Sequence, residues 1–138
     1  MPNETHIPID SATDIVIARH KGRAMAMELG FEDVELTLIA AAISEVSRNI
    51  VEYAKCGEII LQPSRNGTKN GLCIVARDQG PGIPDIAQAM QYGYSTRKSL
   101  GVGLPGAKLL MDEFDIVSKV GEGTTITMKK WCTRNGKQ

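Results

Sequence analysis

The sequence lacks a net charge, a long apolar run and an export signal, and each absence excludes a class of protein. Its 138 residues include 16 basic and 16 acidic side chains, so there is no basic field of the kind that attracts nucleic-acid phosphates. The longest run of small and apolar residues, Leu38 to Ile43, is far shorter than the ~20 residues of a membrane-spanning helix. The N-terminal residues do not follow the charged-then-apolar layout of a signal peptide. We therefore expect a cytoplasmic protein with no nucleic-acid partner and no membrane partner.

Cysteine and histidine are also scarce. Cys56, Cys73 and Cys132 form no C-x-x-C pair and are odd in number, so free thiols are expected rather than a disulfide or a zinc site. Neither His6 nor His20 stands with a cysteine or carboxylate at metal-ligand spacing. Both histidines are interpreted as ordinary polar residues.

The composition that remains is that of a globular domain. Apolar residues make up 42% of the chain and charged residues 23%, which argues against disorder. No internal repeat, low-complexity tract or linker is visible in the sequence. Because a chain of this length buries about two-thirds of its extended surface, residues 1–138 are predicted to form a single domain.

Apolar residues at helical spacing predict two helices in the first half of the chain. A capping-box pattern at Ser11–Asp14 precedes the first helix, and Gly30 supplies its C-terminal stop. The second helix follows Asp33, and Gly57 is expected to end it. The apolar stripes comprise Ile15, Ala18, Gly22, Met25, Ala26 and Leu29 in the first helix, and Leu36, Ile39, Ala40, Ile43, Val46, Ile50 and Ala54 in the second.

Strand patterns surround these helices. Strands are predicted at residues 6–9, 58–62, 71–78, 114–119 and 124–130, and a third helix at residues 105–112. A glycine-rich stretch from Gly80 to Gly106, with a short helical segment near Ile86–Met90, precedes that helix. The order β-α-α-β-β-loop-α-β-β lacks the strict alternation of a doubly wound fold. It favours an α+β two-layer sandwich, in which helices cover one face of a mixed, mostly antiparallel sheet.

Glu45 and Asn49 are one turn apart on the polar side of the second helix, so their side chains share a face. Arg48 and Glu52 flank them at a spacing that allows an ion pair, and whether Arg48 contacts phosphate or only pairs with Glu52 stays open. A solvated helix face with one ion pair would account for this pattern. Alternatively, a carboxylate beside a carboxamide oxygen would hold Mg²⁺ and take a proton from a nucleophile.

Asp78 lies at the end of a predicted strand, on the same face as the apolar residues that alternate before it. An inward carboxylate needs a hydrogen-bond donor, because an unpaired one costs several kcal/mol. The donor is either the turn that follows or the amino group of a ligand. Gly80 and Gly82 favour the ligand, since glycine lets the backbone approach a planar group closely.

The segment Gly101–Gly106 matches G-x-G-x-x-G, but its context does not suit a dinucleotide-binding fold. The preceding residues 94–99 are polar and loop-like, where such a fold needs a strand. The motifs of eukaryotic-type kinases and of P-loop proteins are absent from the sequence. The segment is instead interpreted as a flexible glycine loop leading into a helix whose N-terminal amides would hold phosphate.

Together these motifs resemble a known superfamily. E-x-x-x-N at residues 45–49, D-x-G-x-G at 78–82, G-x-G at 101–103 and G-x-G-T at 121–124 resemble the N, G1, G2 and G3 boxes of the GHKL ATPases. That superfamily includes the gyrase, heat-shock chaperone, histidine-kinase and MutL ATPases and has the Bergerat fold. The segments I-S-E-V-S-R-N-I, D-Q-G-P-G-I-P-D, G-V-G-L-P-G and L-M-D-E-F are similar to those of the RsbT-type serine/threonine switch kinases, over nearly the whole chain. The related anti-sigma-factor kinases usually carry E-A-x-x-N and a following histidine, and Arg48 and Tyr53-Ala54 of this sequence depart from that pattern.

The resemblance implies ATP and Mg²⁺ as cofactors and assigns roles to residues around the triphosphate. It places the general base on Glu45 and a Mg²⁺ ligand on Asn49. Gly101 and Gly103 match the hinge of an ATP lid, and residues of about 92–100 match the lid itself. Within that lid, Arg97 and Lys98 are expected to contact the phosphates.

It also implies a binding site for the adenine base. Asp78 matches the aspartate that accepts a hydrogen bond from the exocyclic amino group. Gly80 and Gly82 match the turn beneath the base. Thr124 matches the threonine that helps this aspartate and a water molecule to hold the adenine.

The implied reaction transfers the γ-phosphoryl group of ATP to a serine or threonine of another protein. The resemblance implies STAS-domain scaffold or antagonist proteins of a stressosome as substrates, and a PP2C-type phosphatase that the released kinase activates. Two alternatives stay open: an anti-sigma factor with kinase activity toward an antagonist, and an ATP-gated adaptor without transferase activity.

Overall fold

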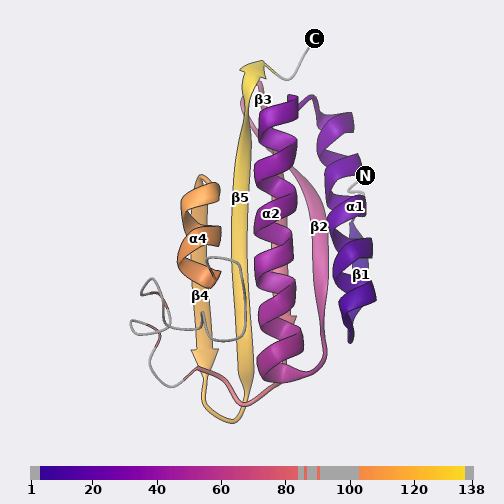
Figure 1. Ribbon diagram of the computed structural model, residues 1–138. Coiled ribbons are helices and arrows are strands. Elements are labelled where there is room, and N and C mark those ends of the chain that lie inside the picture. The colour runs from indigo at the N-terminus through magenta and orange to yellow at the C-terminus, as the bar shows by residue number, and fades with distance from the viewer. Residues whose placement is uncertain (1–3, 84–85, 87–89, 91–102, 136–138) are drawn as a thin grey trace.

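Five strands form one sheet in the computed structural model, which describes residues 4–83, 86, 90 and 103–135 (Figure 1). The strands pair in the order β1-β2-β3-β5-β4, and every pairing among the described residues is antiparallel. Their bounds are β1 Thr5–Ile9, β2 Gly57–Asn66, β3 Lys69–Asp78, β4 Glu113–Lys119 and β5 Gly123–Asn135. β2 extends beyond its predicted end because its pairing with β3 continues through residues 63–66, whose composition resembles a turn, and β5 continues to Asn135.

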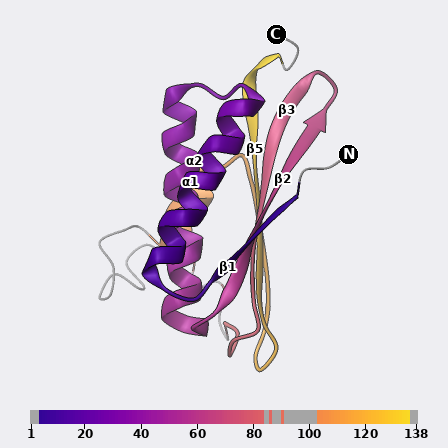
Figure 2. The same cartoon turned by 90° about the vertical axis from the view of Figure 1, so that its right-hand side faces the viewer.

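Helices cover one face of this sheet, as Figure 2 shows for α1 and α2. The helices are α1 Ala12–Leu29, α2 Asp33–Asn49 and α4 Gly103–Leu110, and a π-helical turn, η1 Ile50–Ala54, continues directly from α2. The other face of the sheet carries no helix in the described part of the chain. The predicted α+β two-layer arrangement is therefore confirmed.

The core lies between the helices and the inner face of the sheet. The largest fully buried side chains of the helical layer come from α2 and η1, and those of the sheet from the three central strands and from the end of β1. They are Leu36, Ile39, Ile43, Val46 and Ile50 on the helical side, and Ile9, Ile59, Leu61, Leu72, Ile74, Ile126 and Met128 on the sheet. Burying each such side chain contributes about 1.5–3 kcal/mol, so the helix that carries Glu45 and Asn49 is firmly anchored to the sheet.

The ends of the first helix agree with the sequence. The carboxylate of Asp14 accepts hydrogen bonds from the backbone N–H groups of Asp10 and Ser11, at 2.9 and 3.2 Å. At the other end Gly30 adopts a left-handed conformation, with φ at 101°.

The end of the second helix was predicted incorrectly. The helix changes to π-helical bonding at Ile50 and ends at Ala54, and Gly57 is already the first residue of β2. Lys55 makes the stop instead, with a φ of 76° and its N–H bonded to the carbonyl of Ile50 at 2.8 Å. A π-turn has no clear signature in the spacing of apolar residues, and it often marks a functional site.

Two predictions fall mainly on undescribed residues. In the helical segment predicted near Ile86–Met90, the backbone N–H of Met90 donates to the carbonyl of Ile86 at 3.0 Å. The other residues of that segment, and the lid at residues 92–100, lie outside the described residues. The third helix begins at Gly103, two residues before its predicted start. That residues 1–138 form a single domain stays a prediction.

Candidate functional site

The carboxylate of Glu45 joins α2 to the start of α4. Its Oε1 accepts hydrogen bonds from Nη1 of Arg48, at 2.9 Å, and from the backbone N–H of Gly103, at 3.1 Å. The side chain is only 11% exposed. Because the N-terminal N–H groups of a helix have no partner within it, an acidic side chain is favoured there. Two positions of the predicted site, 58 residues apart in the sequence, are thus in direct contact.

Among the described residues, Nη1 of Arg48 forms an ion pair with Glu45 at 2.9 Å, and the pair with Glu52 that the spacing allows is not formed. The change to π-helical bonding at Ile50 falls between Arg48 and Glu52. Side chains four residues apart on either side of this junction are therefore not placed next to each other as they are in a regular α-helix. The arginine instead pairs three residues back, within the regular part of α2.

Glu45 and Asn49, whose spacing predicted a shared helix face, line one hollow beside the start of α4. The hollow is bordered by Glu45, Arg48, Asn49, Glu52, Tyr53, Gly103 and Leu104. Its polar lining combines carboxylate and carboxamide oxygens with one guanidinium. Such a lining is able to bind a hard cation, to hold an anionic group on the guanidinium, and to accept a proton.

Asp78 ends β3 on the inner face of the sheet, as the alternation predicted, and it is 9% exposed. Its Oδ1 accepts a hydrogen bond from the backbone N–H of Gly80, at 2.8 Å. The carboxylate therefore caps the turn, which was one of the two interpretations. A carboxylate accepts several hydrogen bonds, so this contact is compatible with a ligand donor as well.

The turn after Asp78 is packed from two sides. A Cβ at Gly80 would lie 2.6 Å from the Cβ of Ala54, at the end of η1. Gly82 has a φ of 83°, and a Cβ there would overlap the carbonyl of Lys119. The backbone N–H of Gly121 also donates to the carbonyl of Pro81, at 2.8 Å. The two glycines are thus required by close contacts with the protein itself.

Thr124 lies directly opposite Asp78 in the β3–β5 register and is buried. Paired residues of neighbouring antiparallel strands project to the same side with their Cβ atoms about 4.5–5.5 Å apart. The sheet therefore brings together the two polar residues that the sequence assigned to one adenine site. Of the remaining predicted residues, Gly103 has a φ of 70° and begins α4, while Arg97, Lys98 and Gly101 lie outside the described residues.

Ser118 lies beside Thr124 in the candidate site and was not predicted from the sequence. Its hydroxyl lies 2.7 Å from that of Thr124 and accepts a hydrogen bond from the backbone N–H of Ile83, also at 2.7 Å. Ser118 follows Phe114 and Ile116 on the inner face of β4. Asp78 was identified because it is a polar residue at a strand position that faces the core. Ser118 occupies the same kind of position in β4, so the alternation of apolar residues could have identified it too.

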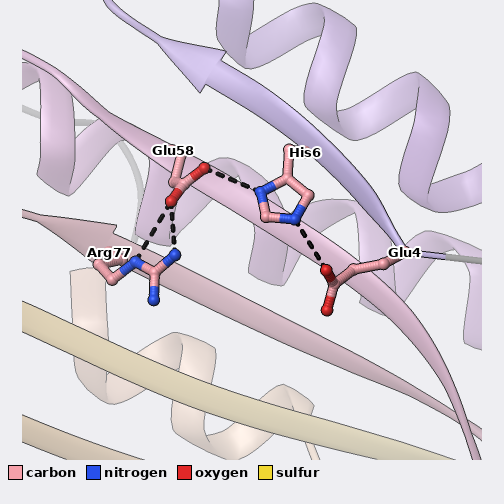
Figure 3. A network of polar contacts seen from close by, with 4 residues as sticks. All are labelled: Glu4, His6, Glu58 and Arg77. Carbon is pink, nitrogen blue, oxygen red and sulfur yellow. Dashed lines mark hydrogen bonds and ion pairs between the residues drawn. The ribbon is translucent and has the colours of Figure 1, made fainter.

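A second polar network lies on the open face of the sheet (Figure 3). Both ring nitrogens of His6 lie near carboxylate oxygens, Nε2 at 2.9 Å from Glu4 and Nδ1 at 3.0 Å from Glu58. Nη2 of Arg77 donates to Glu58 at 2.7 Å. The hydrogen bonds to Glu4 and Glu58 raise the pKa of His6, and those from Arg77 and His6 lower the pKa of Glu58. His6 is thus an exposed polar residue that pairs with two carboxylates, which its sequence neighbourhood did not indicate.

The three cysteines are free thiols. Cys73 and Cys132 are buried, and burial raises the pKa of the Cys73 thiol. Within the described part of the chain, none of the helices is both long enough and apolar enough to cross a bilayer.

Comparisons with known proteins agree with this architecture. The histidine kinase-like ATPase domain family matches residues 10–130. The serine/threonine-protein kinase RsbT of Bacillus subtilis (strain 168) is 50% identical over 131 residues, which cover 95% of this chain and 98% of that protein. The anti-sigma F factor of Caldanaerobacter subterraneus subsp. tengcongensis is 32% identical over 124 residues, covering 86% of this chain and 85% of that protein.

A solved structure shares the fold at lower sequence similarity. The crystal structure of RsbU and RsbW domains from Mycobacterium tuberculosis matches with a TM-score of 0.62 and 21% identity. The match covers 94% of this chain and 32% of that longer chain. The family match implies ATP binding. The chain belongs to the histidine kinase-like ATPase domain family, as an RsbT-like serine/threonine kinase homologue of the partner-switch group.

Proposed function

We propose that this protein transfers the γ-phosphoryl group of ATP to a serine or threonine hydroxyl on STAS-domain stressosome proteins. The observation that carries the proposal is the setting of Glu45. Its carboxylate lies in the same hollow as Asn49, and Arg48 and the N–H of Gly103 fix its position. In phosphoryl transfer, positioning and charge stabilisation provide most of the catalysis, so a carboxylate held this firmly suits the role of general base.

The reaction assigned to Glu45 is an in-line displacement. A bond forms between the acceptor hydroxyl oxygen and the γ-phosphorus, and the bond between that phosphorus and the β–γ bridging oxygen breaks. The carboxylate accepts or orients the hydroxyl proton, and ADP leaves with the electron pair of the broken bond. Because Oε1 of Glu45 is already bonded to two donors, the second oxygen, Oε2, is the one assigned to the proton.

Asn49 is proposed to hold Mg²⁺. No cluster of three or more His, Cys, Asp or Glu side chains that could bind a metal alone is present among the described residues. Mg²⁺ at nucleotide sites takes only one or two protein oxygens, with phosphates and water supplying the rest. The oxygen-rich lining of the hollow fits that donor set. When bound, the ion would neutralise charge on the triphosphate.

The adenine base is assigned to the buried end of β3. Asp78 would accept the hydrogen bond of the exocyclic amino group, and Thr124, opposite it in the register, would complete the recognition. Gly80 and Gly82 hold the turn beside them close to η1 and β4. The assignment of Arg97, Lys98 and Gly101 to the phosphates and the lid hinge rests on their sequence motif alone.

The partners are proposed from the relationship to the RsbT family. Its similarity to RsbT, at 50% identity, favours STAS-domain scaffold proteins as substrates and a PP2C-type phosphatase as the target that the released kinase activates. Similarity to the anti-sigma F factors, near 30% identity, supports a second candidate, an anti-sigma factor that phosphorylates its antagonist. Co-precipitation with a purified sigma factor or a purified STAS scaffold separates the two candidates.

A transfer assay tests the proposal directly. The protein is mixed with γ-labelled ATP, Mg²⁺ and a purified STAS-domain scaffold, and label on serine or threonine is measured. We expect transfer by the native chain, and loss of transfer with retained ATP binding in Glu45→Ala. The matched control is Glu113→Ala, which removes a carboxylate from β4 outside the hollow. Full activity of Glu45→Ala would refute the general-base role, and nucleotide binding without any transfer would favour the adaptor.

A further inference from the structure

The hydroxyl of Ser118 lies at the meeting point of three segments. It is on β4 and half-buried, and it contacts the backbone N–H of Ile83, the hydroxyl of Thr124 and the carbonyl of Gly123, at 2.7, 2.7 and 3.2 Å. Ile83 belongs to the turn that follows Asp78, and the other two residues begin β5. One side chain therefore connects both sides of the proposed adenine site.

The number of hydrogens limits how these contacts are made. A backbone N–H only donates, so Ile83 occupies one lone pair of the Ser118 oxygen. The single hydrogen of Ser118 then goes either to the carbonyl of Gly123 or to the oxygen of Thr124. The carbonyl of Gly123 lies at 3.2 Å, and the hydroxyl oxygens of Ser118 and Thr124 are 2.7 Å apart whichever of the two donates, so an acceptor on a bound ligand decides between the two arrangements. When Ser118 donates to Thr124, the hydrogen of Thr124 is free to donate to a ligand.

This arrangement complements the edge of adenine. The edge presents an amino donor beside the N1 acceptor, and the site presents a carboxylate acceptor, Asp78, opposite a hydroxyl, Thr124. We propose that Ser118 is a positioning residue that makes the hydroxyl of Thr124 a donor toward N1, directly or through a water molecule. The inference rests on the proposed adenine site and adds to it a residue that determines base recognition.

Calorimetric titration with two nucleotides tests this role without the kinase reaction. The full chain and Ser118→Ala are titrated with ATP and with 1-deaza-ATP, in which a C–H group replaces N1. In the native chain, ATP is expected to bind more tightly than 1-deaza-ATP. In Ser118→Ala, ATP affinity is expected to fall by about 3- to 10-fold, the equivalent of one neutral hydrogen bond. The affinity for 1-deaza-ATP is expected to change by less than about 2-fold, since the Thr124 donor has no acceptor there.

Two further variants separate positioning from a general effect on folding. Ser118→Thr keeps the hydroxyl on a residue suited to a strand and is expected to restore the preference for ATP. Thr127→Ala, which removes a hydroxyl from the same strand as Thr124, is expected to leave both affinities unchanged. An equal loss for both nucleotides in Ser118→Ala would overturn the inference, because a structural role alone predicts it.

Asp78→Asn distinguishes failure of this inference from failure of the adenine site itself. If Asp78→Asn weakens ATP binding and Ser118→Ala does not, the adenine site stands and the role of Ser118 is wrong. If neither variant weakens ATP binding, both the adenine assignment and the inference built on it are overturned.

Discussion

The carboxylate of Glu45 accepts the backbone N–H of Gly103 across 3.1 Å, which links α2 to the first residue of α4. The N-terminus of a helix favours negative charge because its first N–H groups have no intrahelical acceptor. The residue proposed as the general base therefore also accepts a hydrogen bond from the first residue of α4. Glu45 thus has a proposed catalytic role and a stabilising hydrogen bond, and different substitutions of this residue separate the two.

Replacing Glu45 by glutamine and by alanine distinguishes its charge from its hydrogen bonding. Both changes are expected to abolish phosphoryl transfer, because neither side chain accepts the hydroxyl proton. Glu45→Ala removes the acceptor of the Gly103 N–H, and we expect it to lower the free energy of unfolding by about 1–3 kcal/mol. Glu45→Gln retains a carbonyl acceptor and is expected to lose less than half as much. Urea denaturation measures the free energy of unfolding of the native chain and of both variants. If Glu45→Ala were as stable as the native chain, the contact with Gly103 would contribute nothing to stability.

Asp78→Asn tests the adenine assignment. Asparagine keeps an oxygen that accepts the N–H of Gly80, so the turn is expected to survive. A charge-assisted hydrogen bond to the amino group of adenine, worth about 1.5–3 kcal/mol, would be weakened. We expect ATP affinity in calorimetry to fall roughly 10- to 100-fold, with little change in the thermal midpoint. Unchanged affinity would remove Asp78 from the nucleotide site.

Structural features that depend on residues close together in the sequence, such as helices, helix caps and strand faces, were predictable from the sequence. The spacing of apolar residues located α1 and α2, and the capping pattern at Ser11 located the start of α1. Period-two alternation placed Asp78 on the inner face. These features depend on residues a few positions apart, so the sequence contains them directly.

Contacts between distant segments were harder to predict. Nothing local indicates that the backbone N–H of Gly103 donates to Glu45 or that Arg48 pairs with the same carboxylate. The network around Ser118 likewise depends on strand register, which brings β4 and β5 beside the turn after β3. The motifs predict which residues belong to the candidate site, and only the fold shows which of the described ones are in contact.

Gly123→Ala is expected to damage both the fold and the nucleotide site. Gly123 has a φ of 114°, and a Cβ there would overlap the backbone carbonyl of Asp78. Because the obstacle is backbone, relief of the clash would move Asp78 or Thr124. We expect a loss of at least about 2 kcal/mol in the free energy of unfolding, from strain and overpacking together.

Gly121→Ala is the matched control for that change. Gly121 also has a positive φ, 83°, but a Cβ there would meet nothing within 4 Å. Only the conformational cost of about 1 kcal/mol should appear. Thermal denaturation and ATP titration of both variants make the comparison. A Gly121→Ala variant as damaged as Gly123→Ala would show that left-handed backbone, and not contact with Asp78, is the cause.

The network of His6, Glu4, Glu58 and Arg77 predicts a pH-dependent attachment of β1 to β2 (Figure 3). The hydrogen bonds to Glu4 and Glu58 raise the pKa of His6 above its ordinary 6.5. Protonated His6 therefore favours the folded state. This contribution is complete below pH 6.5 and is lost as the pH rises through the raised pKa.

Ionisation of Glu58 limits the stabilising effect of the network at low pH. Arg77 and His6 lower the pKa of Glu58 below its ordinary 4.5. The contribution of ionised Glu58 to folding stability is therefore present above pH 4.5 and is lost as the pH falls through the lowered pKa. The network should therefore act most strongly between about pH 4.5 and 6.5, the two ordinary values. NMR titration of the His6 ring is expected to give a midpoint above 6.5 that falls in Glu4→Gln and in Glu58→Gln. Because these groups are exposed, added salt should reduce the shift, and a midpoint that neither variant moves would contradict the coupling.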